Sequence, residues 1–247
     1  MLAKLLTRAA ALAAPGSAAA PAAAEPEAAV PPPGPRDLLR LVVSHNLDPH
    51  IGLHPSWLPP HWPARYRRVS AWGPAGQAVL GALVRGQHGG APDYQFDSRL
   101  KRLMLMDAAA LRRLAVYAGL AAHRGLLEQG SPAGSQLRRQ ARRYDRDAMH
   151  FTLQRMPALS QLRMEVRAMQ ERPLATGRLL VSRGYRLLLG ALATEGEEGV
   201  RRVRHKFPRR LAALSVPALQ PRQTQQLSEL MLSCIVPERL PQWDWLF

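Results

Sequence analysis

The chain has 247 residues, 47% of them hydrophobic, which suffices for one ordinary domain or two small ones with a buried core. Its single cysteine, Cys234, excludes an intrachain disulfide and a cysteine-built zinc site, and it favours a reducing compartment. The formal net charge of +16 comes almost entirely from arginine and attracts anionic partners, whether nucleic acid, an acidic membrane leaflet or an acidic protein. No apolar run reaches the roughly 18 residues of a membrane span without a charge or proline, so we expect no transmembrane helix.

Residues 1–35 are mostly alanine and proline, a composition that cannot bury enough apolar surface to offset chain entropy. We predict a disordered tail over this range. Because Lys4 and Arg8 precede the first acid, Glu25, a cleaved targeting peptide is an alternative interpretation, as is a misannotated start.

Residues 36–95 are predicted to form an irregular segment, rich in aromatic residues and proline, that leads into a linker. Five prolines between residues 46 and 63 exclude a long helix or a central strand there. Glycines and prolines recur over residues 73–92 and indicate a loop-rich connection. Trp57 and Trp62 lie in the irregular part and must pack on something, because exposed indoles are costly.

Residues 96–247 show helical periodicity, and period-two alternation is almost absent. We predict an all-α bundle of about six to eight short helices. Asp107 is a plausible N-cap, residues 195–199 form an acidic turn suited to a helix N-terminus, and the last helix starts near Pro221. Gly184 and Gly190 should weaken their helix by up to ~1 kcal/mol each. The expected apolar stripes are Phe96, Leu100 and Leu103; Leu111, Leu114, Ala118 and Ala121; Tyr144, Ala148 and Phe151; Leu159, Leu162, Val166 and Met169; Val181, Tyr185, Leu188 and Leu192; Val200, Val203 and Phe207; Leu227, Leu230, Met231, Cys234 and Ile235.

The sequence lacks the common phosphate-binding, zinc-protease and hydrolase motifs, which weakens the case for an enzyme. The four histidines His45, His50, His54 and His61 could converge on zinc, but the prolines between them favour ordinary loop histidines. We therefore predict no metal and no cofactor.

Two acids and the cysteine are further candidates for reactive groups. Asp145 and Asp147 could be catalytic carboxylates, yet Arg142, Arg143 and Arg146 surround them in sequence and favour surface ion pairs. Cys234 lies on an apolar stripe, where a thiol is usually inert and burial raises its pKa.

Two arginine clusters are more distinctive. The first places Arg138, Arg139, Arg142, Arg143 and Arg146 on one face of a helix. The second comprises Arg201, Arg202, Arg204, His205, Lys206, Arg209 and Arg210. Guanidinium groups suit phosphate and carboxylate alike, so an acidic protein or lipid surface, a nucleic acid and a plain solvated face all stay open.

The C-terminus carries four large apolar side chains in its last five residues, among them Trp243, Trp245 and Phe247. Chain ends usually fray in water. The tail therefore either folds back onto the bundle or serves as an anchor that a partner buries.

Residues 53–59, with the sequence LHPSWLP, resemble a similarly placed segment of the SctK (YscK) family, an accessory component of bacterial type III secretion systems. The layout is also similar, with an aromatic N-terminal part, a Leu- and Arg-rich middle such as LKRLMLM at residues 100–106, and a helical domain after it. The resemblance implies a non-enzymatic cytoplasmic adaptor, peripheral to the inner membrane. It would link the ring protein (SctD) to the pod protein (SctQ), which carries the ATPase stator.

The resemblance supplies no active-site residues. The candidate partner-binding residues from the sequence are Trp57, Trp62, Arg138, Arg139, Arg142, Arg143, Trp243, Trp245 and Phe247. The main alternative is a basic RNA-associated helical protein, such as a ribosomal or assembly factor, and an enzyme with an unrecognised site is a third interpretation.

Overall fold

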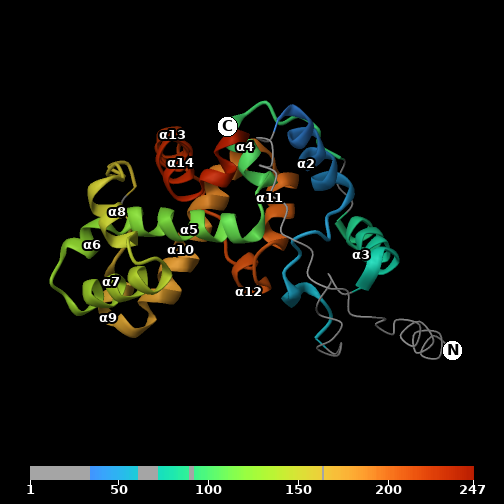
Figure 1. Cartoon of the computed structure of the whole chain (residues 1–247). Coiled ribbons are helices and arrows are strands. Elements are labelled where there is room, and N and C mark those ends of the chain that lie inside the picture. The colour runs from blue at the N-terminus through green and yellow to red at the C-terminus, as the bar shows by residue number, and fades with distance from the viewer. Residues whose placement is uncertain (1–33, 61–71, 89–91, 163) are drawn as a thin grey trace, which may run out of the picture. The chain divides into compact units, whose positions relative to one another are not determined.

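The computed structural model describes residues 34–60, 72–88, 92–162 and 164–247, which belong to a single unit, Pro33–Phe247 (Figure 1). The predicted disordered tail therefore lies outside the described residues except for Gly34 and Pro35, which begin the first described helix. Trp62 and His61 also lie outside the described residues.

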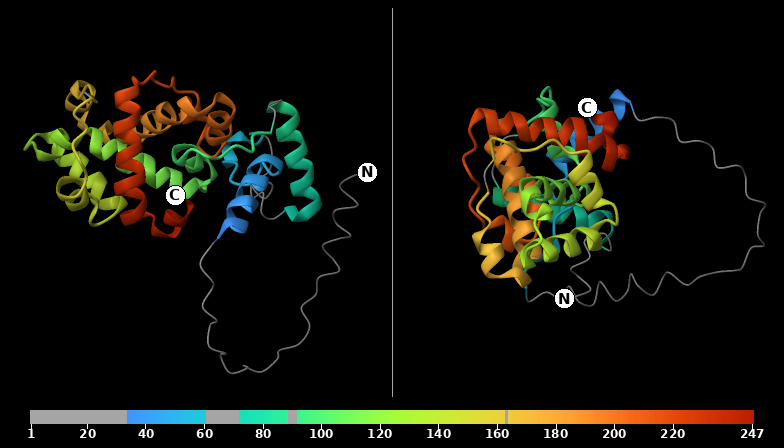
Figure 2. Two further views of the ribbon diagram at one scale, coloured as in Figure 1. Left: turned by 90° about the horizontal axis from the view of Figure 1, so that it is seen from above. Right: turned by 90° about the vertical axis from the view of Figure 1, so that its left-hand side faces the viewer.

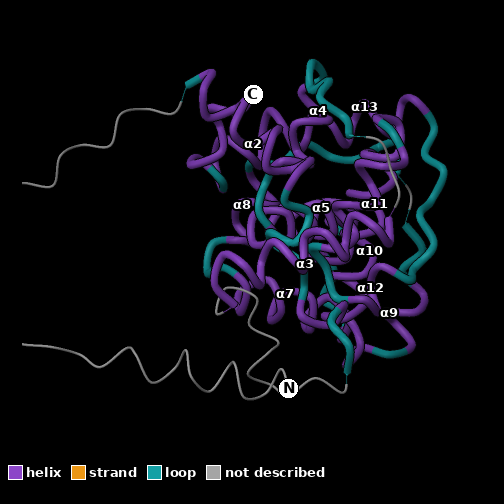
Figure 3. Tube along the Cα trace, turned by 90° about the vertical axis from the view of Figure 1, so that its right-hand side faces the viewer, coloured by secondary structure: helices purple, strands orange, loops and turns teal. Residues whose placement is uncertain are grey.

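All regular structure in the described ranges is helical, which confirms the all-α prediction (Figure 3). Thirteen α-helices form there, more than the expected six to eight, because five of them are single turns of four or five residues. They are α2 (Pro35–Leu47), α3 (Gly73–His88), α4 (Arg99–Arg102), α5 (Ala108–Ala122), α6 (Arg124–Glu128), α7 (Pro132–Tyr144), α8 (Ala148–Gln154), α9 (Arg167–Glu171), α10 (Thr176–Leu192), α11 (Glu197–His205), α12 (Arg209–Ala212), α13 (Pro221–Leu230) and α14 (Val236–Arg239).

Tighter or wider turns join several of these helices. The 3-10 segments are η1 (Pro55–Trp57), η4 (Leu103–Leu105), η5 (Pro173–Ala175), η6 (Ala193–Glu195) and η8 (Pro241–Leu246), while η7 (Met231–Ile235) is a π-helix between α13 and α14.

Helix α5 begins directly after Asp107, the N-cap residue predicted from the sequence. The Asp107 carboxylate accepts a hydrogen bond from the Ala110 backbone N–H at 2.7 Å and so caps the helix, as predicted. Its predicted stripe, which includes Leu111 and Leu114, is buried. Figure 2 shows green α5 inside the fold, with orange α10 and the red C-terminal segment on adjoining sides.

Helices α5 and α10 approach each other closely at two glycines. A Cβ atom on Gly184 would lie 1.9 Å from the Ala115 carbonyl oxygen, and one on Gly119 would lie 2.8 Å from the Leu180 carbonyl oxygen. The expectation that Gly184 only weakens α10 was therefore incomplete. Its missing side chain is what lets the two backbones meet.

Two expectations for the structure of the N-terminal part were wrong. Residues 73–92 were expected to form a loop, but Gly73–His88 is helix α3. Pro74 does not interrupt this helix, because it stands in the first turn, where proline is tolerated. Its Leu80 and Val84 pack with Leu58 in a small separate core. The supposedly irregular segment also begins with helix α2.

The predicted helical stripe from Leu159 to Met169 is mostly loop, and only Arg167–Glu171 is helical. Two side chains of α13 form hydrogen bonds with the backbone of this loop. The Gln226 amide oxygen accepts from the Gln161 N–H, and the Gln223 amide donates to the Gln161 carbonyl. A turn after Tyr144 separates α7 from α8, and the Tyr144 side chain, expected in the core, is 43% exposed.

Candidate functional site

Helix α7 presents the first arginine cluster to solvent. Ser131 caps the helix by accepting a hydrogen bond from the Gly134 N–H at 3.1 Å. Leu137 and Ala141 point into the core, so the positions between them face outward. Arg139, Arg142 and Arg143 are exposed on this side and make no ion pair or side-chain hydrogen bond to another described residue.

Arg138 holds this surface in place. Its guanidinium donates to the Leu127 and Gln129 carbonyls, both at 2.7 Å, and to the Ser135 hydroxyl at 3.0 Å. Those carbonyls close the C-terminal turn of α6, so the side chain ties α6 to α7. Together with Ser135, the four predicted arginines Arg138, Arg139, Arg142 and Arg143 line one shallow surface hollow, which we call the α7 arginine face.

Arg146 does not belong to this face, contrary to the sequence prediction, because α7 ends at Tyr144. The expected ion pairs of Asp145 with Arg142, Arg143 and Arg146 are also not formed. Asp145 accepts from the Tyr117 hydroxyl at 2.6 Å and from Arg113 at 2.9 Å, and Arg239 lies 3.6 Å away. The hydrogen bond from Tyr117, together with these guanidinium groups, holds the pKa of the Asp145 carboxyl below its usual value. Asp145 thus joins α5, α7 and α14 as a structural node.

The second basic cluster is divided: Arg201, Arg209 and Arg210 are exposed, whereas Arg202 and Lys206 make contacts inside the fold. The Lys206 ammonium is part-buried and donates to the Met104 carbonyl at 2.9 Å and to the Met106 carbonyl at 2.6 Å. Burial lowers its pKa to about 8. Arg202 donates to the His45 carbonyl at 3.1 Å and to the Asn46 side chain at 2.7 Å. Sequence reasoning missed both internal roles.

Trp57 packs within the protein. Its indole N–H donates to the Phe207 carbonyl at 2.9 Å, and its ring meets the His205 ring edge-on at 4.6 Å. The Arg209 guanidinium lies 5.8 Å from the Trp57 ring. The ring remains partly exposed.

The C-terminal tail folds back onto the bundle, which was one of the two predicted alternatives. Leu246 is 1% exposed, and its carbonyl accepts a hydrogen bond from Arg102 at 3.1 Å. Trp243, Trp245 and Phe247 pack against the main core and stay partly exposed.

The three described histidines of the N-terminal part face different neighbours. His45 stacks edge-on against Phe96, and His54 accepts a hydrogen bond from the Ser56 N–H. His50 lies beside Gly81 of α3. Across the described ranges, no three His, Cys, Asp or Glu side chains gather as metal ligands would. Burial raises the pKa of the Cys234 thiol.

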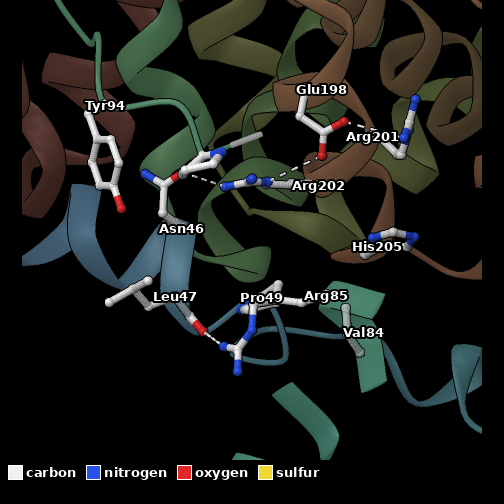
Figure 4. Close-up of a pocket in the computed structure, with 11 residues that line it drawn as sticks. Asn46, Leu47, Pro49, Val84, Arg85, Tyr94, Glu198, Arg201, Arg202 and His205 are labelled. Atoms are coloured by element: carbon white, nitrogen blue, oxygen red, sulfur yellow. Dashed lines mark hydrogen bonds and ion pairs between the residues drawn. The ribbon is translucent and has the colours of Figure 1, made fainter. Parts of the chain in front are cut away.

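One hollow of about 170 Å³ lies between α2, α3 and α11 (Figure 4). Its central polar groups are engaged with one another: Arg202 reaches both Asn46 and Glu198, and Arg201 also meets Glu198. The Arg85 guanidinium donates to the Leu47 carbonyl.

The model of one protein family, described as YOP proteins translocation protein K (YscK), matches residues 43–243. A search among curated proteins and a search among solved structures found no match. Within the described residues, none of the helices combines the length and apolar character needed to span a bilayer.

Proposed function

The chain belongs to the YscK family of type III secretion proteins, and we propose that it acts there as a non-enzymatic cytoplasmic adaptor. In this proposal it links the inner-membrane ring to the sorting-platform pod. Its partners would be the ring protein (SctD-like) and the pod protein (SctQ-like), and it would be peripheral to the inner membrane through them.

The observation that supports an adaptor best is the α7 arginine face. Arg139, Arg142 and Arg143 project from one rigid helix and have no partner among the described residues. Unpaired guanidinium groups on a fixed scaffold fit a carboxylate-rich surface, because each can form paired hydrogen bonds to a carboxylate. Such charge complementarity speeds encounter and selects the partner.

The aromatic residues take a smaller part in the proposal. Contacts within the protein cover most of the side-chain surface of four aromatic residues, Trp57, Trp243, Trp245 and Phe247. Only the exposed part of each ring can therefore contact a partner. Trp62 stays a proposed contact outside the described residues.

The proposal is tested by reversing charge on the α7 arginine face. The triple variant Arg139→Glu, Arg142→Glu and Arg143→Glu lowers the net charge by six, from +16 to +10. The chain is co-expressed with the ring and pod proteins of its own secretion system, and complexes are isolated by size exclusion. We expect the unmodified chain to co-elute with at least one partner and the triple variant to lose that complex.

A matched control makes the same charge change elsewhere. Arg99, Arg178 and Arg222 are exposed on α4, α10 and α13, so replacing these three with glutamate also gives +10. The control should keep the complex. Equal loss in the two triple variants would indicate a nonspecific charge effect and contradict the proposal. Co-purifying RNA whose affinity falls steeply with salt would favour the RNA-associated alternative.

A further inference from the structure

Helix α2 has an apolar stripe on its solvent side. Leu39, Val43 and Leu47 recur every fourth residue and are 63%, 37% and 48% exposed. The opposite side of α2 already packs on the main core through Val42, Leu38 and Leu41. The exposed stripe is therefore a second apolar face, which the described part of the fold leaves uncovered.

The stripe ends at the hollow shown in Figure 4. Leu47 lines this hollow together with Tyr94, which is 53% exposed, and Val84 of α3. At about 170 Å³ the hollow has the size of one large side chain. Stripe and hollow together form a surface that we call the α2 surface.

The charge on the α2 surface is predominantly positive. Arg36 and Arg40 are exposed on the same side of α2 as the stripe. The hollow contributes three more guanidinium groups, Arg85, Arg201 and Arg202, against the single carboxylate of Glu198. Backbone or side-chain acceptors on α2 hold Arg85 and Arg202, so these charges are fixed in place before any partner arrives.

We propose that the α2 surface binds an acidic amphipathic helix of a protein partner. The four-residue spacing of the stripe matches the apolar face of a second helix packed along α2. One large side chain of that helix would fill the hollow, and its flanking carboxylates would meet the arginines. The concave hollow suits an inserted side chain better than a flat lipid surface, and the aliphatic stripe suits a protein better than a phosphate backbone.

The α2 surface is distinct from the α7 arginine face. An adaptor between two partners needs two docking surfaces, and the α2 surface supplies the second. Its test uses neither the ring nor the pod protein, so the two proposals can fail separately.

The probe is a synthetic, fluorescently labelled helical peptide of about four turns, with leucine at every fourth position and glutamate between. A second peptide carries lysine in place of glutamate. Binding to the purified full chain is measured by fluorescence anisotropy at low and high salt. The double variant Val43→Glu and Leu47→Glu changes the stripe, and Leu174→Glu is the matched control because Leu174 is 89% exposed on η5.

We expect the acidic peptide to bind the unmodified chain at least about tenfold more tightly than it binds the double variant. The Leu174 control should bind like the unmodified chain, and circular dichroism should show that all variants are folded. Equal affinity for the acidic and basic peptides, or for the unmodified chain and the double variant, would overturn the proposal. Binding to phosphatidylglycerol vesicles through Leu47 without binding to the peptide would overturn it in favour of a lipid surface.

Discussion

Replacing Gly184 with alanine tests the close approach of α5 and α10. The new Cβ atom would lie 1.9 Å from the Ala115 carbonyl oxygen, whereas real Cβ contacts are not shorter than 3.0 Å. The helices must therefore separate locally by at least about 1.1 Å, the difference between these distances. The contacted atom is backbone and cannot rotate away, so we take the upper end of the overpacking range, ~3 kcal/mol.

Alanine also improves helix propensity, which returns up to ~1 kcal/mol. The net loss in the free energy of unfolding is therefore ~2 kcal/mol, which corresponds to a fall of about 4–8 °C in Tm. Urea and thermal unfolding followed by circular dichroism measure both quantities. Gly86→Ala is the matched control, because Gly86 lies inside α3 with nothing within 4 Å of its Cβ position. The control should be as stable as the unmodified chain or more stable, and the same result for Gly184→Ala would refute the reasoning.

Three further predictions concern buried groups and the tail. Burial lowers the pKa of Lys206 from 10.5 to about 8, so the unfolded chain binds more protons between these values and stability rises with pH across that window. Urea unfolding should show this rise in the unmodified chain and not in Lys206→Met, and identical pH profiles would contradict the assigned burial. Burial lowers the pKa of His45 from 6.5 to about 3, so the free energy of unfolding should fall as pH drops through this range. His45→Gln should lose less stability in the same acid titration, and an equal loss would argue against a buried neutral ring. Truncation after Pro241 removes the buried Leu246 and three aromatic rings packed on the core, so melting curves should show a loss of ~3–5 kcal/mol, whereas an unchanged Tm would mean that the tail is dispensable for folding.

The sequence predicted helices well where the signals were local. Asp107 begins α5 and Pro221 begins α13 because capping and proline preferences act within one turn of the chain. The spacing of apolar residues from Leu159 to Met169 predicted a helix where most of the segment is loop. A loop can also bury an apolar residue at every third or fourth position, so this spacing alone does not identify a helix. The glutamines of α13 that satisfy this loop are more than 60 residues away in sequence.

The candidate site was predictable in part for the same reason. The spacing of Arg138, Arg139, Arg142 and Arg143 placed them together on α7. The inward roles of Arg202 and Lys206 could not be read from their sequence neighbours, because their acceptors come from α2 and η4, about 100 or more residues earlier. The stripe at Leu39, Val43 and Leu47 had a readable four-residue spacing, but only the fold shows that this face is the exposed one.

The most direct test of the adaptor account is the mass of the complex in solution. The purified chain is mixed with the cytoplasmic domain of the ring protein and with the pod protein of the same secretion system, and the mixture is analysed by size exclusion with light scattering. The account predicts one species that contains all three proteins and that forms only when this chain is present. Separate elution of all three, or a ring–pod complex that forms equally well without this chain, would contradict it.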